Sequence, residues 1–404
     1  MKIAGHLFKN FNHQPSDPIF ELMKRFQADS RSNKVNLGIG MYCNAAGELP
    51  VLRSVWLAKE FLKERNQPSR YLPMAGYSDY CCAARALVFG DDADTECIAT
   101  IQTLGGTGAL RIGAEVLKRH FPEAEVWVSD TGWDNHLTIF SNAGFSVRRY
   151  PYLDKGSYTV DFEAMYSCLE RLPRGSIVLL HACCHNPTGA DLSKAQWLHL
   201  AELVRDRGLL PFFDFAYQGF AAGIDEDAYA IRLMERQNMA FVVASSFSKN
   251  FALYGERCGA LFFCCQNESQ AGLVQGQMEY AVRGSYSNPP LHGADIISYI
   301  LHETGLCDIW RTEVTEMRER ISGMRQCLLD ALSRNSARLD YYRLSGPRGM
   351  FLDSVLSPTE VDQLRSQLGI YLAPSGRLCL AGLNQANVEM VAEAILDIVD
   401  KRSI

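Results

Sequence analysis

Between about residues 50 and 300, short apolar runs alternate with segments of helical periodicity, and this alternation most constrains the fold. The apolar runs predict strands at Ile98–Leu104, Glu125–Ser129, Ser176–His181, Leu209–Asp214, Phe241–Ser245 and Cys258–Cys264. The segments between them predict helices at Leu110–His120, Phe162–Leu172, Lys194–Arg207 and Asp227–Arg236. Such alternation is typical of an α/β fold, with a mainly parallel sheet covered by helices on both faces.

The two ends of the chain have a different pattern. Further helices are predicted at Pro18–Ala28, Gly293–Glu303, Asp308–Ser333 and Asn387–Val399, with short strands at Gly349–Asp353 and Arg377–Ala381. We therefore expect a large α/β domain over residues 47–314 and a smaller α+β domain built from residues 17–46 and 315–404. Residues 1–16 are polar and aromatic without a period, which suits an arm that is ordered by something else.

Composition excludes several classes of function. The 404 residues are 47% hydrophobic and 21% charged, which supports a large core, and the net charge of −6 with no basic run argues against nucleic acid as a partner. No stretch approaches the length of a membrane span, and the N-terminus has no secretory signal pattern. We expect a cytoplasmic protein whose 13 cysteines are mostly free, buried thiols.

The strongest local signal is Lys249, which closely follows an apolar run. Ser246 and Ser248 flank it, and Arg257 follows eight residues later. A lysine amine forms a Schiff base with a carbonyl, while hydroxyls and a guanidinium bind a phosphate dianion. This composition predicts a site for a phosphorylated carbonyl cofactor, and a solvent-exposed lysine after a strand is the alternative.

Two further segments fit such a site. Glycines at Gly105–Gly108 precede a predicted helix from Ala109, where backbone N–H groups can bind phosphate, although the spacing matches no nucleotide loop. Asp214 and Tyr217 emerge at the end of a predicted strand, where open α/β sheets bind ligands. Asp214 can keep a pyridine nitrogen protonated and Tyr217 can bond a phenolic oxygen, while a helix N-cap is the alternative for Asp214.

The segment from His181 to Gly189 places two histidines beside Cys183 and Cys184. The spacing does not match structural zinc sites, so we expect no metal. Asn186 precedes a proline and is held extended, which presents its amide to a site. Trp133 and His136 can supply a stacking face and a supporting partner, with ordinary packing as their alternative.

Taken together, these segments resemble the class I pyridoxal-phosphate-dependent aminotransferases, in the aspartate and aromatic amino-acid branch, over nearly the whole chain. The phrases at Tyr71–Met74, Ile101–Leu104 and Glu226–Arg232 look most like the bacterial aromatic members. The motifs that carry the resemblance are Asn36–Gly40, Gly105–Arg111, His185–Gly189, Asp214–Gly219, Ser246–Asn250, Ser287–Pro290 and Ser375–Arg377. The resemblance implies fold-type I, with a mainly parallel seven-stranded sheet in the large domain and a smaller α+β domain.

The resemblance also implies a role for each residue. Lys249 would be the Schiff-base lysine and then the acid/base, with Asp214 on the pyridinium nitrogen and Tyr217 and Asn186 on the ring oxygen. Trp133 would stack on the ring, and His136 would orient Asp214. The phosphate would be bound by Gly106, Thr107, Ser246, Ser248, Arg257 and the neighbouring subunit's Tyr71. Substrate would be bound by Gly40, Trp133, Asn186, Phe351, Arg377 at the α-carboxylate, and Arg283 from the neighbour at a distal carboxylate, which implies a homodimer.

The implied reaction is ping-pong transamination between an L-amino acid and a 2-oxo acid. Arg283 favours aspartate or glutamate, whereas Met41 and Cys43 at the entrance favour aromatic side chains. We therefore expect dual specificity, with an aspartate-preferring enzyme, or a lyase or decarboxylase on the same scaffold, as alternatives. After Phe351 the chain reads Leu-Asp-Ser, where relatives usually carry another aromatic residue and a glycine. Asp353 either faces solvent or points inward, where it would alter the pocket or favour a cationic substrate.

Overall fold

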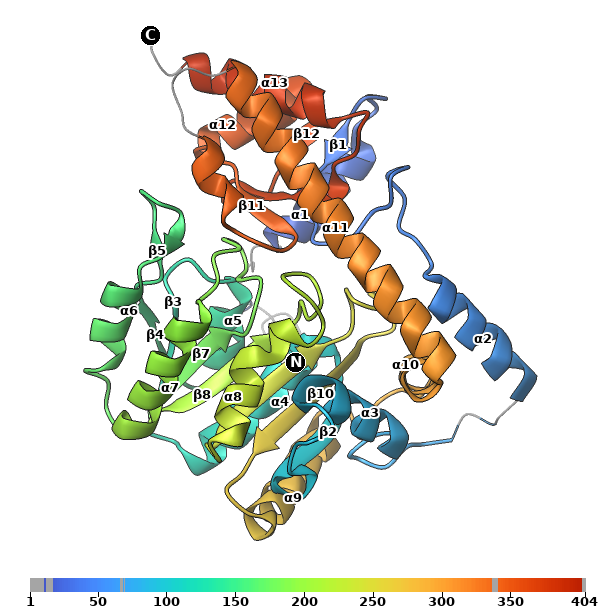
Figure 1. Ribbon diagram of the computed structural model, residues 1–404, viewed down its shortest axis with the longest axis vertical. Coiled ribbons are helices and arrows are strands. Elements are labelled where there is room, and N and C mark those ends of the chain that lie inside the picture. The colour runs from blue at the N-terminus through green and yellow to red at the C-terminus, as the bar shows by residue number, and fades with distance from the viewer. Residues whose placement is uncertain (1–10, 12–16, 66–67, 69, 336–340, 402–404) are drawn as a thin grey trace, which may run out of the picture.

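A seven-stranded sheet forms the centre of the protein (Figure 1), in a computed structural model that describes residues 11, 17–65, 68, 70–335 and 341–401. The predicted arm lies outside the described residues, apart from Phe11. The strand order is β2-β10-β9-β8-β7-β3-β4. These strands are β2 (Ile98–Leu104), β3 (Glu125–Ser129), β4 (Ser146–Tyr150), β7 (Ile177–His181), β8 (Leu210–Phe215), β9 (Phe241–Ser246) and β10 (Cys258–Cys264). Only β10 is antiparallel to its neighbours, which confirms the mainly parallel sheet.

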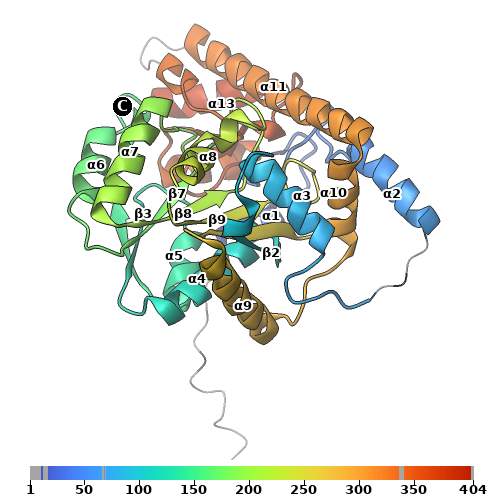
Figure 2. The ribbon, with the colours of Figure 1, turned by 60° about the horizontal axis from the view of Figure 1, so that its bottom comes forward.

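Helices cover both faces of this sheet (Figure 2). One face carries α4 (Gly105–His120), α5 (Asn135–Asn142) and α9 (Glu268–Ser285). The other carries α3 (Ser78–Phe89), α6 (Phe162–Leu169), α7 (Lys194–Arg207) and α8 (Tyr229–Arg236). Successive residues of β9 alternate between the two cores, as the period of a strand requires: Val242 packs into one and Val243 into the other. Strands buried on both faces read as the continuous apolar runs seen in the sequence.

A second, smaller group of elements combines the two ends of the chain. Strand β1 (Val35–Asn36), from near the N-terminus, pairs in parallel with β12 (Ile370–Tyr371), from near the C-terminus. Strand β11 (Phe351–Asp353) pairs antiparallel with β13 (Arg377–Cys379). Around these strands lie α1 (Pro18–Ala28), α12 (Pro358–Gln363) and α13 (Val388–Asp400). The long α11 (Thr304–Asn335) runs from this group down to α10 (His292–His302) and α2 (Arg53–Arg65) (Figure 1). The bounds of the two predicted domains stay a prediction.

Several boundaries differ from the sequence-based expectation. Helix α4 begins at Gly105 and not at Ala109, so the predicted glycine loop is the first turn of the helix. Strand β8 extends one residue past Asp214, to Phe215. Periodicity did not predict α2, α3, α5, α9 or β4; α3 is buried on several sides, and β4 is a largely exposed edge strand, so neither has a simple alternation.

The connections between these elements include further short elements. They contain the hairpin of β5 (Leu153–Asp154) and β6 (Thr159–Val160), a π-helical turn at Leu364–Leu368, and 3₁₀ turns at Thr95–Cys97, Glu226–Ala228, Tyr341–Ser345 and Leu380–Gly382.

All thirteen cysteines are free, as expected, but only six of them are buried: Cys81, Cys183, Cys184, Cys258, Cys264 and Cys379. Among the described residues, no helix is long and apolar enough to cross a membrane.

Candidate active site

The candidate site lies at the carboxyl ends of β7, β8 and β9, three neighbouring parallel strands. Asp214 is the penultimate residue of β8 and pairs in register with His181, the last residue of β7. Ser246 ends β9, and Lys249 lies in the turn that follows. Because the carboxyl ends of parallel strands share one edge, residues far apart in the sequence meet there.

Donors for an anion gather where α4 begins. We call the set Gly106, Thr107, Ser246, Ser248 and Arg257 the anion site. Within it, the Ser248 hydroxyl accepts hydrogen bonds from Nη1 of Arg257 (3.3 Å) and from the Ser246 hydroxyl (3.3 Å). Gly105 has φ +69°, and a Cβ there would lie 2.7 Å from Nη2 of Arg257. Thr107 is exposed at the helix start, so its hydroxyl and the first-turn N–H groups are open to a phosphate dianion.

Asp214 is a buried carboxylate that His136 contacts directly. Its Oδ2 atom lies 2.8 Å from Nε2 of His136, and the residue is only 6% exposed. Burial opposes ionisation, but the hydrogen bond from His136 and the charges of His136, His181 and Lys249 outweigh burial, so the pKa of Asp214 lies below its ordinary value. A buried anion of this kind is suited to hold a proton on a ring nitrogen that binds against it.

His181 completes a buried cluster with His136 and Asp214. Their ligand atoms lie within 4.8 Å of one another, which is the composition of a metal site. Burial lowers the pKa of His181 to about 4, and its Nε2 atom has no hydrogen-bond partner among the described residues. The Asp214 carboxylate has two possible uses, as a metal ligand or as the partner of a protonated ring nitrogen. The expectation of a site without metal therefore stays a prediction.

Lys249 lies beside Tyr217 and interacts with the charge of Asp214. Its Nζ atom is 5.0 Å from the centroid of the Tyr217 ring. Burial lowers the pKa of Lys249, the Asp214 charge raises it, and the charges of Arg257 and Arg377 lower it, to about 8. Lys249 is half-buried, so the alternative of a solvent-exposed lysine is wrong. With the lowered pKa, a fraction of the amine is neutral and nucleophilic near neutral pH.

Arg377 comes from the smaller group of elements and closes the other side of the site. Its Nη1 atom donates to Oδ1 of Asn186 (3.1 Å), and its Nη2 atom donates to the carbonyl of Gly38 (2.9 Å). The guanidinium lies 4.2 Å from the centroid of the Phe351 ring. Gly40 allows this packing, because a Cβ there would lie 2.8 Å from Cζ of Phe351. The arginine is thus held by a cation–π contact and by hydrogen bonds to Asn186 and Gly38.

Three other residues that were predicted for the site lie at its edge or on the surface of the chain. Trp133 is half-buried, with its ring edge-to-face against His136 at 5.2 Å between centroids. Tyr71 is 92% exposed, and Arg283 is also exposed near the end of α9. The structure therefore brings together the predicted residues of one chain, but it leaves Tyr71 and Arg283 on the surface of that chain.

Cys43 and Asp353 are two residues whose effect on specificity stays a prediction. Cys43 is half-buried, and burial raises the pKa of its thiol. Asp353 is also half-buried: its Oδ1 atom accepts the N–H of Val355 (2.9 Å), and burial raises the pKa of the carboxyl group. Asp353 ends β11 and pairs in register with Arg377 of β13, so it is neither fully exposed nor remote from the site.

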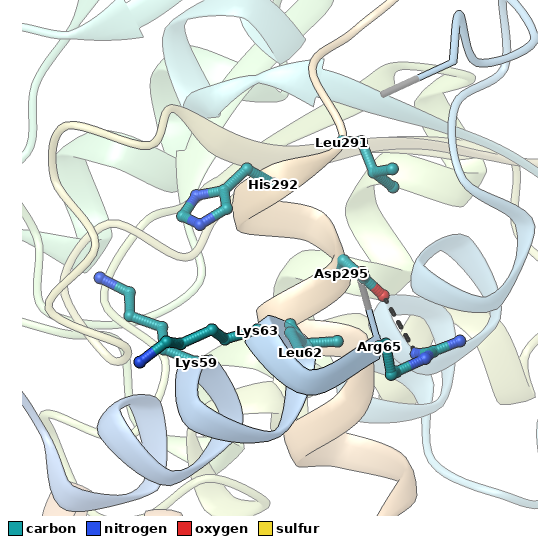
Figure 3. Close-up of a pocket in the computed structure, with 7 residues that line it drawn as sticks. All are labelled: Lys59, Leu62, Lys63, Arg65, Leu291, His292 and Asp295. Carbon is teal, nitrogen blue, oxygen red and sulfur yellow. Dashed lines mark ion pairs between the residues drawn. The ribbon is translucent and has the colours of Figure 1, made fainter. Parts of the chain in front are cut away.

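A separate cavity of about 260 Å³ lies between α2 and α10 (Figure 3). Lys59, Lys63 and Arg65 line it from α2, while His292 and Asp295 line it from α10, with Arg65 and Asp295 3.9 Å apart. No residue of the candidate site lines this cavity, so it is not the place of the chemistry.

No sequence motif predicts several of the residues that support the site. His185 is hydrogen-bonded to Ser129 (2.9 Å) and Thr188 (2.8 Å), which is a structural use of a histidine that suggested metal. Asp227, which is buried, and Asp191, which is half-buried, accept hydrogen bonds from backbone N–H groups. A carboxylate a few residues beyond a site motif is the only sequence signal for them.

A nucleophilic lysine, an ionised buried aspartate and an anion site at one sheet edge define an enzyme that uses a phosphorylated carbonyl cofactor. The comparisons narrow the class: a family model described as aminotransferase class I and II matches residues 32–395. The chain belongs to this family and is an aminotransferase.

Similar proteins include both branches that the motifs suggest. The aromatic-amino-acid aminotransferase of Escherichia coli is 48% identical, over 96% of this chain and 99% of the relative. An aspartate aminotransferase of Pseudomonas aeruginosa is 41% identical, over 97% of this chain and 100% of the relative. The structure of an aromatic-amino-acid aminotransferase of Burkholderia pseudomallei, covalently bound to pyridoxal phosphate, matches with a TM-score of 0.94 and 44% identity, over 97% of this chain and 99% of that one.

Proposed function

We propose that this chain transfers amino groups between aromatic or dicarboxylic L-amino acids and 2-oxo acids, using pyridoxal 5'-phosphate held by the candidate site. The observation that carries the proposal is the position of Lys249, whose amine of lowered pKa lies beside the ionised Asp214 and next to the anion site. These groups fit the aldehyde, the ring nitrogen and the phosphate of that cofactor. When bound, pyridoxal phosphate supplies the aldehyde and an electron-accepting ring.

Each side chain has a defined task. Lys249 would bind the aldehyde carbon of the cofactor, and its amine would carry the proton between Cα of the substrate and C4′ of the cofactor. Asp214, held by His136, would keep the proton on the ring nitrogen. Asn186 and Tyr217 would hold the ring oxygen, and Trp133 would stack on the ring. The anion site binds the phosphate and so fixes the ring in place.

The substrate tasks fall to residues on the other side of the site. Arg377 binds the α-carboxylate with two parallel donors, and Phe351 and Gly40 support it. Met41 and Cys43 offer apolar, uncharged surface at the entrance to an aromatic side chain. Similarity to both aromatic and aspartate enzymes supports dual specificity.

We also propose a homodimer that shares its sites. Tyr71 of the partner subunit would reach the phosphate, and the partner's Arg283 would bind a distal carboxylate. Exposed large apolar side chains support a covered surface: Tyr71 is 92% exposed, Val51 is 67% exposed and Trp56 is 55% exposed. Thirteen free thiols support a reducing compartment, the cytoplasm.

A panel of amino donors and oxo-acid acceptors tests the proposal. We expect phenylalanine, tyrosine and aspartate all to donate to 2-oxoglutarate, with parallel double-reciprocal lines for a ping-pong reaction. A preference for aspartate above about a thousandfold in kcat/KM would refute dual specificity. Release of ammonia or carbon dioxide without an oxo-acid acceptor would refute transamination itself.

A further inference from the structure

The loop that carries Tyr217 is fixed by a single buried carboxylate. Asp227 is 4% exposed and accepts four backbone N–H groups. Its Oδ2 atom accepts those of Gly219 (2.8 Å) and Ala221 (3.0 Å), and its Oδ1 atom accepts those of Ala222 (2.8 Å) and Gly223 (3.3 Å). A carboxylate is the side chain best suited to this arrangement, because it offers two acceptor oxygens and a charge that strengthens each bond.

The same loop is tied to the turn that carries Lys249. Nδ2 of Asn250 donates to the carbonyl of Gln218 (3.3 Å), and Nε2 of Gln218 donates to the carbonyls of Leu87 (2.9 Å) and Ile224 (3.0 Å). The residue after Tyr217 and the residue after Lys249 are thus directly bonded. Asp227 holds the far side of this loop, so its charge decides where the Tyr217 backbone lies.

The loop that carries Asn186 repeats the pattern with a different aspartate. Asp191 accepts the N–H of Cys184 on Oδ2 (2.8 Å) and that of His185 on Oδ1 (2.9 Å). Cys184 has φ +50°, a conformation that a side-chain-bearing residue holds only when its surroundings fix it. Two strand-end loops, each with one polar side chain directed to the site, are therefore each fixed by one aspartate, which is buried for Asp227 and half-buried for Asp191.

We infer that Asp227 and Asp191 are positioning residues that place the Tyr217 hydroxyl and the Asn186 amide on the ring oxygen of the cofactor. The inference rests on the proposed function, which assigns that oxygen to Tyr217 and Asn186. Neither aspartate touches the cofactor in this account; each acts through the backbone that its carboxylate binds. Loss of the charge relaxes the loop, and the hydroxyl or amide leaves hydrogen-bonding distance.

The test uses holoenzyme and the visible absorbance of its bound cofactor. A donor on the ring oxygen stabilises the oxygen as an anion, so removing the donor raises the pH at which the absorbance changes. We expect Tyr217→Phe to raise this midpoint and Asp227→Asn to raise it in the same direction, with a fall in kcat of about tenfold. Asp191→Asn should also raise this midpoint, because Asp191 acts through Asn186. Asn186→Ala is the variant with which its shift is compared.

A double-mutant cycle separates positioning from a general structural role. If Asp227 acts through Tyr217, the double variant Tyr217→Phe with Asp227→Asn has the midpoint of Tyr217→Phe alone. Asp154→Asn is the matched control, because Asp154 also accepts backbone N–H groups, from Gly156 (2.8 Å) and Ser157 (3.2 Å), but in an exposed turn. It should leave the midpoint unchanged.

The outcomes are distinct. A lower melting temperature for Asp227→Asn with an unchanged midpoint, or additive shifts in the double variant, would overturn the inference. If Asp227→Asn does not fold, the cycle of Asp191→Asn with Asn186→Ala decides in the same way. If Tyr217→Phe itself leaves the midpoint unchanged, the proposed role of Tyr217 fails, which is a separate result.

Discussion

The Nζ atom of Lys249 lies 5.0 Å from the centroid of the Tyr217 ring. The two residues come from successive strand-end loops of β9 and β8, and Asn250 joins the loops through the carbonyl of Gln218. The amine and the phenol thus belong to one rigid edge of the sheet. If the aldehyde carbon of the cofactor binds beside Lys249, the ring oxygen next to that carbon would lie beside Tyr217. Proton transfer at that carbon needs this arrangement.

The low pKa of Lys249 predicts a pH dependence for cofactor capture. A lysine with its ordinary pKa of 10.5 is almost entirely protonated at neutral pH, whereas a pKa of about 8 leaves about a tenth of the amine neutral at pH 7. We expect the rate at which the cofactor-free chain takes up pyridoxal phosphate to rise with pH and level off above about 8. Stopped-flow absorbance measures this rate, and a rise that continues up to pH 10 would contradict the lowered pKa.

The substitution Arg377→Lys tests recognition of the α-carboxylate. A lysine keeps the charge but loses the planar pair of donors and the contact with the Phe351 face. We expect the KM for every amino donor to rise by about a hundredfold, because each loses a bidentate partner. Arg283→Lys is the comparison: it should raise the KM for aspartate and leave that for phenylalanine nearly unchanged. Equal effects of both variants on both donors would contradict the assigned roles.

The close approach of α4 to the sheet predicts a stability change. A Cβ added at Gly113 would lie 2.7 Å from Cζ of Phe212, which is fully buried. We expect Gly113→Ala to lower the free energy of unfolding by about 1–3 kcal/mol through overpacking. Gly276→Ala in α9 is the matched control, because a Cβ there meets no atom within 4 Å. Alanine favours a helix, so the control should be neutral or up to about 1 kcal/mol more stable. Denaturant unfolding of both variants checks the difference, and equal destabilisation would contradict it.

The central sheet could be predicted from the sequence because its strands are buried on both faces and read as apolar runs. The predicted helix Lys194–Arg207 is confirmed to the residue, since Ser193 and Gln196 form a capping box and Gly208 ends the helix with φ +61°. Edge strand β4 could not be predicted in this way, because most of its side chains are exposed and show no alternation.

Only part of the site could be predicted from the sequence. Lys249, Asp214 and the anion site follow from residue types at strand ends, and their convergence follows from the parallel sheet. The start of α4 at Gly105 was not predicted, because glycine is a poor helix former and only the bond pattern of the first turn identifies it. Asp191 and Asp227 act through backbone N–H groups of loops whose shape appears only after folding.

The most direct test of the account is the substitution Lys249→Ala in the full-length protein, measured by turnover and by the visible absorbance of added pyridoxal phosphate. We expect a folded protein with the dimer size of the parent in gel filtration, no measurable transamination, and no absorbance band of lysine-bound cofactor. Transamination by Lys249→Ala at a rate comparable to the parent would contradict the assignment of Lys249 as the nucleophile and proton carrier.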